Sequence, residues 1–266
     1  MTQTNVSESN QAVLLDIRDR VAHITLNRPH AMNAINWDFM DDLSGALDVA
    51  KEDSSVVAVV VRGAGGRAFS AGGDLKALHE ENMMEDAGRH LAFTAAMRDL
   101  FLKVENLELP TIAVIDGYAL AGGLELALCC DLIICTDDSS IGDQHANRFL
   151  IPGAGGTQRL PRRVGMQPAL ELLYTGRRLN GPESVAYGIA LRSYPREHLD
   201  AGLEELLSQL RPKSRTGLGM TKRVAARGVE LPLRDALDLE RLTVQEYFSC
   251  YPDATAGVVA FNEKGV

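Results

Sequence analysis

Residues 116–130 read DGYALAGGLELALCC, and this stretch decides which fold we expect. A buried strand, TIAVID, precedes it at residues 111–116, and a short helix is expected to begin at Gly122, the first of a glycine pair. The first backbone N–H groups of a helix have no partner inside the helix and lie at its positive end. The sequence therefore predicts an anion or oxyanion receptor at this strand-to-helix junction, with a tight turn as the alternative.

Glu125 follows the glycine pair by one turn, inside the apolar run LAGGLELAL. A carboxylate buried there is costly unless it is hydrogen-bonded or used, and loss of water around it should raise its pKa toward the range of a general acid. An acid beside an oxyanion receptor is a catalytic arrangement. The alternative is a structural carboxylate that is satisfied by hydrogen bonds.

A second glycine-containing segment, RAFSAGGDLKAL, occupies residues 67–78. Two adjacent glycines let the backbone approach a ligand closely, and Lys76 follows within reach of a phosphate. Just upstream, residues 63–68 match the dinucleotide-binding pattern G-x-G-x-x-A. That pattern requires a helix beginning on the glycines, whereas we expect a loop to continue through residues 69–73, so we reject dinucleotide binding.

Strands alternate with helices in the first half of the chain, which indicates an α/β fold with buried parallel strands. The expected elements are a hairpin at 12–17 and 21–26, a helix from near Trp37, a buried strand at 56–61, a helix at about 87–105 and a strand at 131–136. From about Arg196 the pattern is helical, with segments near 198–210, 216–226, 231–249 and 253–264. We therefore divide the chain into a polar N-terminal extension (1–11), an α/β core (12–195) and a helical region (196–266).

Composition excludes several classes of protein. Of the 266 residues, 27 are Lys or Arg and 36 are Asp or Glu, and the net charge is −9, so we expect no nucleic-acid partner. The longest apolar stretch, Tyr118 to Thr136, is broken by Glu125, Asp131 and the glycine pair, which predicts buried core rather than a membrane helix. The opening residues have no pattern of a signal or transit peptide, so we expect a cytoplasmic protein.

Metal binding is also not expected. The four cysteines do not form the two-residue spacing of a zinc knuckle or a redox pair, which favours reduced and mostly buried thiols. They are Cys129, Cys130, Cys135 and Cys250.

Five motifs taken together resemble the crotonase superfamily, the family of enoyl-CoA hydratases and isomerases, over nearly the whole chain. They are ITLNRP at 24–29 with Asn33-Ala34, AFSAGGDLK at 68–76, GYALAGGLE at 117–125, IPGAGGTQRL at 151–160 and YTG at 174–176. The resemblance implies a spiral of repeated β-β-α units and a C-terminal helical region used for oligomerisation. It also implies a homo-oligomer, either a trimer or a dimer of trimers.

The resemblance assigns roles to single residues. It implies that the N–H groups of Gly73 and Gly122 hold the thioester oxygen as it becomes an enolate, and that Glu125 is one of two catalytic glutamates. Contacts with the coenzyme A thioester are implied for His30, Ala31, Met32, Ala71, Asp74, Lys76 and Gly153, and, from a neighbouring subunit's tail, for Phe261 and Lys264. The tail lacks the usual Lys-Pro-x-Phe continuation. No separate cofactor is expected, because coenzyme A enters as part of the substrate.

His145 departs from the family pattern. Alignment without a gap from Glu125 to the Ile151-Pro152-Gly153 turn puts His145 where hydratases have their second glutamate. Imidazole is a competent base near pH 7 and imidazolium a competent acid, so His145 can preserve hydration with a different pair. Two alternatives remain open: His145 indicates other enolate chemistry, or it belongs to a polar clamp on the substrate's distal group. The other members of that clamp would be Asp143, Gln144, Asn147 and Arg148.

The function predicted from the sequence is hydration of a 2-enoyl-CoA through an enolate that the oxyanion receptor stabilises. The first alternative is another reaction of the family, namely C–C bond hydrolysis, decarboxylation or double-bond isomerisation, with His145 in place of the second glutamate. The second is a scaffold that binds coenzyme A without catalysis. The buried Glu125 argues against the scaffold, because an unused buried carboxylate is costly.

Overall fold

The main sheet has six strands in the order β1-β2-β3-β5-β7-β9. We analysed a computed structural model, which describes residues 11–83 and 85–263. The strands are β1 (Val13–Arg18), β2 (Val21–Leu26), β3 (Ala58–Gly63), β5 (Thr111–Ile115), β7 (Leu132–Thr136) and β9 (Arg192–Tyr194). Strands β1 and β2 form the predicted antiparallel hairpin, and the other pairs are parallel. The strand expected at 56–61 begins two residues later, at Ala58.

A second sheet has three short parallel strands in the order β4-β6-β8. They are β4 (Ala68–Ser70), β6 (Tyr118–Leu120) and β8 (Ser140–Gly142). Each follows a strand of the main sheet, so the pairs β3/β4, β5/β6 and β7/β8 repeat one arrangement. The prediction of a loop through 69–73 is wrong at its start, because Ser70 pairs with Ala119, which is distant in sequence.

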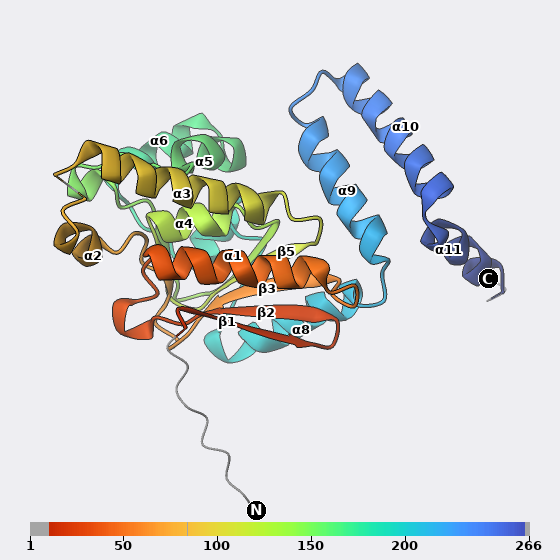
Figure 1. The fold of residues 1–266 in the computed structure, drawn as a ribbon, viewed down its shortest axis with the longest axis horizontal. Helices are drawn as coiled ribbons and strands as arrows, with labels where there is room; N and C mark the ends of the chain where they lie inside the picture. The colour runs from red at the N-terminus through yellow and green to blue at the C-terminus, as the bar shows by residue number, and fades with distance from the viewer. Residues whose placement is uncertain (1–10, 84, 264–266) are drawn as a thin grey trace, which may run out of the picture.

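Helices cover both faces of the main sheet. Figure 1 shows α1 (Trp37–Glu52) and α3 (Ala87–Glu105) on one side and α8 (Leu199–Leu210) on the other. The larger buried cluster lies under α1 and α3 and includes Phe39, Leu43 and Phe101. A smaller cluster joins α8 to the opposite face of the sheet, through Leu199 and Leu203. Strands buried on both faces explain the continuous apolar runs in the sequence.

Five further helices complete the region that holds the site. They are α2 (Leu75–Glu80), α4 (Gly122–Leu128), α5 (Gly156–Val164), α6 (Met166–Thr175) and α7 (Gly181–Ala186). Helix α4 begins at the predicted residue. The other four were not predicted from the sequence. Because of them, helical structure is already extensive before residue 195. Helix α8 follows residue 195 and packs on the main sheet; the division of the chain at 195 stays a prediction.

Three C-terminal helices extend away from these layers (Figure 1). They are α9 (Arg215–Gly228), α10 (Leu233–Cys250) and α11 (Pro252–Glu263), as the sequence predicted. Helix α9 is fastened to the core by Lys222, whose Nζ lies 2.9 Å from an oxygen of Asp131 and donates to the carbonyl oxygen of Leu109. Among the residues described, no helix has both the length and the apolar character needed to cross a membrane.

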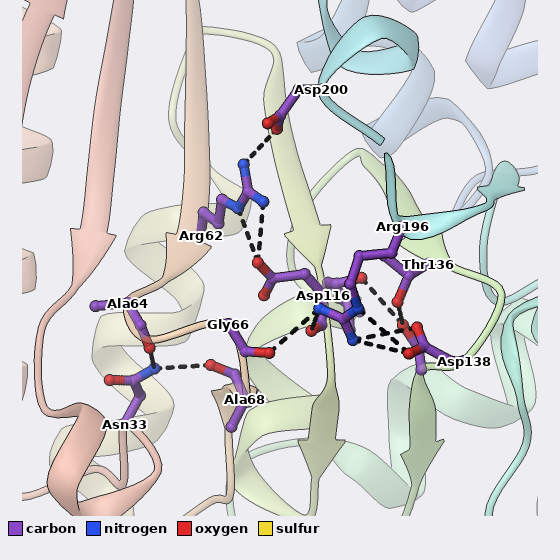
Figure 2. A network of polar contacts seen from close by, with 12 residues as sticks. Asn33, Arg62, Ala64, Gly66, Ala68, Asp116, Thr136, Asp138, Arg196 and Asp200 are labelled. Carbon is purple, nitrogen blue, oxygen red and sulfur yellow. Dashed lines mark hydrogen bonds and ion pairs between the residues drawn. The ribbon is translucent and has the colours of Figure 1, made fainter. Parts of the chain in front are cut away.

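Side chains tie the turns between the two sheets together (Figure 2). Arg62, near the end of β3, donates from Nε and Nη2 to Oδ2 of Asp116, which follows β5, at 3.1 and 3.0 Å. Arg196 donates to the carbonyl oxygens of Gly66 and Asp116 and pairs with Asp138, which follows β7. The turns after three neighbouring strands are therefore held in a fixed relation.

Asn33 fastens the loop between β3 and β4 from the other side. Its Nδ2 donates to the carbonyl oxygens of Ala64 and Ala68, at 3.1 and 2.7 Å. The side chain of Asn33 is completely buried, so these bonds are not exposed to competition from water. They fix the start of β4, whose far end leads into Gly72 and Gly73.

Candidate active site

Gly73 and Gly122 lie side by side where β4 and β6 end. A Cβ built on Gly72 would lie 2.9 Å from the backbone nitrogen of Gly122, and one built on Gly122 would lie 3.4 Å from that of Gly73. Neither N–H group donates a hydrogen bond among the described residues, and Gly122 is the first residue of α4. Two adjacent free N–H groups are what an anion or oxyanion receptor requires, and that role stays a prediction.

Ala121 connects β6 to α4 in an unusual conformation. Its φ is +50° and its ψ is −120°, in a region that non-glycine residues rarely adopt. Such conformations cost about 1–3 kcal/mol and persist only where surrounding contacts impose them. Here the Ala121 N–H donates to the carbonyl oxygen of Gly142 in β8, and Glu125 N–H donates to the Ala121 carbonyl. The strained turn leaves the Gly122 N–H free at the start of the helix.

Gly123, the second glycine of the pair, has a different role from the first. A Cβ at this position would overlap the carbonyl oxygen of Ser70. Helix α4 can therefore approach β4 only because residue 123 has no side chain. In the sequence the two glycines form one motif, whereas in the fold Gly122 lines the cavity and Gly123 makes the close approach.

Glu125 is completely buried, as predicted. Its Oε1 accepts hydrogen bonds from the backbone N–H groups of Ala154 and Gly156, at 3.0 and 2.7 Å, while its Oε2 has no hydrogen-bond partner among the described residues. Burial raises the pKa of Glu125, although the bonds from Gly156 and Ala154 and the charge of His145 oppose the shift. Oε1 is therefore fixed by two hydrogen bonds, and Oε2 is left available for a further one.

His145 lies on the loop after β8 and reaches this free oxygen. Its Nε2 is 3.9 Å from Oε2 of Glu125. Its Nδ1 is 2.9 Å from Oδ2 and 3.1 Å from Oδ1 of Asp143, and Oδ1 also accepts a hydrogen bond from the His145 backbone N–H. Burial lowers the pKa of His145, but the hydrogen bond that His145 makes to Asp143 and the charges of Asp143 and Glu125 outweigh it, and the pKa is raised on balance.

A cavity of about 1010 Å³ joins these groups. Gly73, Gly122 and His145 line it, and Glu125 lies directly behind His145. One wall is apolar and comes from helices α2 and α3. Another part of the lining is polar, and we call it the polar rim. The apolar wall includes Leu75, Leu78, Phe93 and Met97, and the polar rim includes Arg67, Tyr118, Gln144, Asn147, Arg148 and Arg178.

The residues expected to contact coenzyme A divide into two groups. Met32, Ala71, Asp74 and Gly153 line the cavity, whereas His30, Ala31 and Lys76 lie outside its lining. Asp74 also caps α2 and forms an ion pair of 2.9 Å with Arg28.

Lys76 is largely exposed and lies 3.8 Å from Glu80, so its side chain is not aimed into the cavity wall. Phe261 is in α11, but its side chain is outside what the structure describes, and Lys264 is outside the described residues.

Several site residues were missed by the sequence analysis. Asp143 was considered only as part of a substrate clamp, although its carboxylate contacts His145 directly. Its position two residues before the histidine was the available signal. Arg67 and Arg178 were not considered for the site, and nothing in their local sequence indicates that they line one cavity. Among the described residues, no group of three or more His, Cys, Asp or Glu side chains is arranged to hold a metal ion.

Comparison with known proteins shows which proteins this chain is similar to. The family model described as enoyl-CoA hydratase/isomerase matches residues 16–266. The chain is 32% identical over 252 residues to a short-chain-enoyl-CoA hydratase of Clostridium acetobutylicum, covering 95% of each chain, and 31% identical to a crotonyl-CoA hydratase of Syntrophomonas wolfei, again covering 95% of each. The crystal structure of an enoyl-CoA hydratase from Bacillus anthracis superimposes with a TM-score of 0.89 at 32% identity, covering 96% of this chain and 97% of that one.

Proposed function

The chain belongs to the enoyl-CoA hydratase/isomerase family, the crotonase superfamily, as an enzyme that acts on acyl-CoA, and we propose that it adds water to a 2-enoyl-CoA. The observation that supports hydration most directly is the pairing of two proton-transfer groups beside two free N–H groups. Glu125 Oε2 and His145 Nε2 face each other across 3.9 Å, next to Gly73 and Gly122.

The oxyanion receptor supplies the first part of the mechanism. The thioester carbonyl oxygen accepts hydrogen bonds from Gly73 and Gly122, and it becomes negatively charged as the enolate forms. Preorganised donors of this kind contribute about 3 kcal/mol each to the stability of the transition state. The substrate brings coenzyme A with it, and the proposed reaction requires no separate cofactor.

The acid–base pair supplies the second part. Hydrogen bonds to water are about 2.8 Å long, so one water molecule can bond to both Glu125 Oε2 and His145 Nε2 across the 3.9 Å gap. In the ion-pair state, the Glu125 carboxylate takes a proton from this water as the oxygen bonds to C3 of the substrate. The electron pair of the double bond moves into the enolate, and imidazolium Nε2–H of His145 returns a proton to C2. One proton enters the pair and one leaves it.

Substrate contact is proposed for the residues that reach the cavity, namely Met32, Ala71, Asp74 and Gly153. The apolar wall from α2 and α3 fits an acyl chain because burying hydrocarbon there removes it from water. His30, Ala31 and Lys76 stay predicted contacts for the coenzyme A moiety, together with Phe261 and Lys264 from a neighbouring subunit.

Incubation of the purified protein with crotonyl-CoA, followed by mass analysis of the products, tests this function. We expect a 3-hydroxyacyl thioester that is heavier than the substrate by one water, and much slower formation of it by Glu125→Gln. If the protein binds coenzyme A but returns crotonyl-CoA unchanged, hydration is wrong. The histidine in place of a second glutamate then favours C–C bond hydrolysis or decarboxylation, which 3-oxoacyl and malonyl-type thioesters would reveal.

We further propose that the protein is a homo-oligomer, with a trimer or a pair of trimers as the expected state. Exposed apolar side chains recur at helical spacing along α10, where a single copy of the chain leaves them in contact with water. They are Leu233, Leu237, Val244 and Phe248. Light scattering coupled to size-exclusion chromatography tests this state, and a monomer at micromolar concentration contradicts it. The cytoplasmic location stays a prediction.

A further inference from the structure

Asp143 makes an unusual set of contacts for a buried carboxylate. It is almost completely buried, and every hydrogen bond that its side chain accepts among the described residues comes from His145. No arginine or lysine of the described residues pairs with it. A carboxylate is costly to bury without a cationic or strongly hydrogen-bonding partner. His145 is the partner that offsets the cost of burying Asp143.

The contact also decides which nitrogen of His145 is available for chemistry. A carboxylate only accepts hydrogen bonds, so Nδ1 must hold a proton to bond with Asp143. The exchangeable site is then Nε2. This atom faces Oε2 of Glu125, the carboxyl oxygen without a partner. Asp143 therefore fixes both the tautomer and the orientation of the ring.

Counting charges shows what the pair can replace. An isolated histidine alternates between +1 and 0, whereas a glutamate alternates between 0 and −1. Histidine bonded to an ionised aspartate alternates between 0 and −1, with the mobile proton at Nε2. We propose that Asp143 is a positioning residue that joins His145 in one unit with the charge states of a single carboxyl group, so that Glu125 works opposite the electrostatic equivalent of a second glutamate. This inference rests on the proposed hydratase function.

The surroundings of the pair are consistent with this charge balance. Among the described residues, Glu125 on α4 is the charged group that the structure pairs with Nε2. Behind it, Arg159 on α5 pairs with Glu105 at 2.7 Å, so the charge of Arg159 is already matched. Arg148 and Arg178 belong to the rim of the same cavity, and Arg178 donates to the side-chain oxygen of Gln144 rather than to Asp143.

Asp143→Asn is the first test, because it keeps the shape of the side chain and removes the charge. Asparagine can still accept a hydrogen bond from Nδ1, but the charge that helps to raise the pKa of His145 is gone, so the lowering by burial is less opposed and the pKa should fall. We expect turnover of crotonyl-CoA to fall by about 10- to 100-fold near pH 8, with the alkaline limb of the kcat profile moved to lower pH and KM changed by less than about threefold. An unchanged alkaline limb would overturn the proposal.

A double substitution separates positioning from simple structural support. In His145→Glu, Asp143 lies beside a second carboxylate and should repel it, so we expect low activity. Adding Asp143→Asn removes this repulsion, and we expect activity to rise by about 10-fold or more. Asp143→Asn would thus lower turnover when residue 145 is histidine and raise it when residue 145 is glutamate. If Asp143→Asn lowers activity in both backgrounds, Asp143 is only structural and the proposal fails.

NMR titration of His145 provides a readout that does not depend on hydration. In the unaltered full chain we expect the Nδ1–H tautomer in the neutral imidazole and a titration midpoint that falls in Asp143→Asn. Asp116→Asn is the matched control, because Asp116 is a buried carboxylate paired with Arg62 outside the site, and it should leave the His145 midpoint unchanged. If crotonyl-CoA is not hydrated but the midpoint moves as expected, the hydratase assignment is wrong while the pairing holds. An Nε2–H tautomer would overturn the pairing itself.

Discussion

The oxyanion side of the cavity is held by backbone atoms in direct contact, whereas the acid–base side is held by hydrogen bonds between side chains and loops. On the first side, Gly73 and Gly122 are fixed by the close approach of α4 to β4 at Gly123. On the second, Glu125 is held by two N–H groups and His145 by Asp143. Close backbone contact leaves no space for another residue type, whereas hydrogen bonds admit exchanges that conserve charge. We therefore expect the acid–base side to accept an exchange such as His145 for the glutamate that the family resemblance implies.

Gly123→Ala should have the largest effect, because it disrupts the close backbone contact that holds the oxyanion side. The new Cβ would overlap the carbonyl oxygen of Ser70, and α4 must move away from β4 to relieve the overlap. We expect the free energy of unfolding to fall by about 3 kcal/mol, with activity almost lost. Chemical denaturation and the crotonyl-CoA assay measure the two effects.

Gly45→Ala is its matched control. Gly45 is an exposed residue within α1, and a Cβ there meets nothing within 4 Å. Alanine is the better helix former by about 1 kcal/mol, so this variant should be as stable as the unaltered chain or more stable. Equal losses in both variants would show that the contact with Ser70 does not hold the oxyanion side in place.

Glu125→Gln should have the next largest effect, on chemistry rather than on folding. Glutamine keeps an oxygen that can accept from Ala154 and Gly156, but it cannot take a proton from water. Turnover should fall by about 100- to 10,000-fold while coenzyme A binding persists. Glu80→Gln, a change at an exposed residue, should keep full activity. Turnover of Glu125→Gln equal to that of the unaltered chain would remove Glu125 from the mechanism.

The same variant gives a stability prediction with a definite sign. The pKa of Glu125 is raised in the folded state, so the folded protein holds this proton more tightly than the unfolded chain. The bound proton stabilises the folded state fully at pH values below 4.5, the ordinary pKa of a glutamate. This stabilisation declines as the pH rises toward the raised pKa of Glu125, and the total loss is about 1.4 kcal/mol for each unit by which the folded-state pKa exceeds the ordinary one. Glu125→Gln should therefore lose less stability than the unaltered chain on going from pH 5 to pH 8, as thermal melts would show.

His145→Ala changes the acid–base side, and we expect a smaller loss of activity than in Glu125→Gln. Oxyanion stabilisation and Glu125 remain, so we expect turnover to fall by about 100-fold and the remaining activity to lose the alkaline limb set by the imidazole. The pKa of His145 is raised on balance, so that limb should lie above the ordinary histidine range in the unaltered chain. His79→Ala, a change at an exposed residue of α2, is the control. A pH profile that keeps the same limb would return His145 to a structural role.

Local sequence patterns were enough to predict the start of α4 and the burial of Glu125, but not the contacts between segments that are distant in the sequence or that depend on how a loop closes. The strand-to-helix junction at Gly122 and the burial of Glu125 follow from a few consecutive residues, and both are confirmed. The short strands β4, β6 and β8 depend on pairing between distant segments, so a pattern within three residues could not show them. The contact between Asp143 and His145 depends on how one loop closes. Lys76 was expected near a phosphate from spacing alone, and its side chain is 84% exposed.

Ala121→Gly should have the smallest effect, and it tests whether backbone strain at Ala121 contributes to the oxyanion side. Glycine adopts φ +50° and ψ −120° without the steric cost that alanine has there, but it gains freedom in the unfolded chain. The two terms oppose each other, and we expect a net stabilisation of about 1 kcal/mol or less, seen as a small rise in melting temperature. Ala119→Gly in β6, where φ is not positive, should instead destabilise by roughly 1 kcal/mol or more. If both glycine variants are destabilised equally, Ala121 is not strained, and the free Gly122 N–H results from the start of α4 alone.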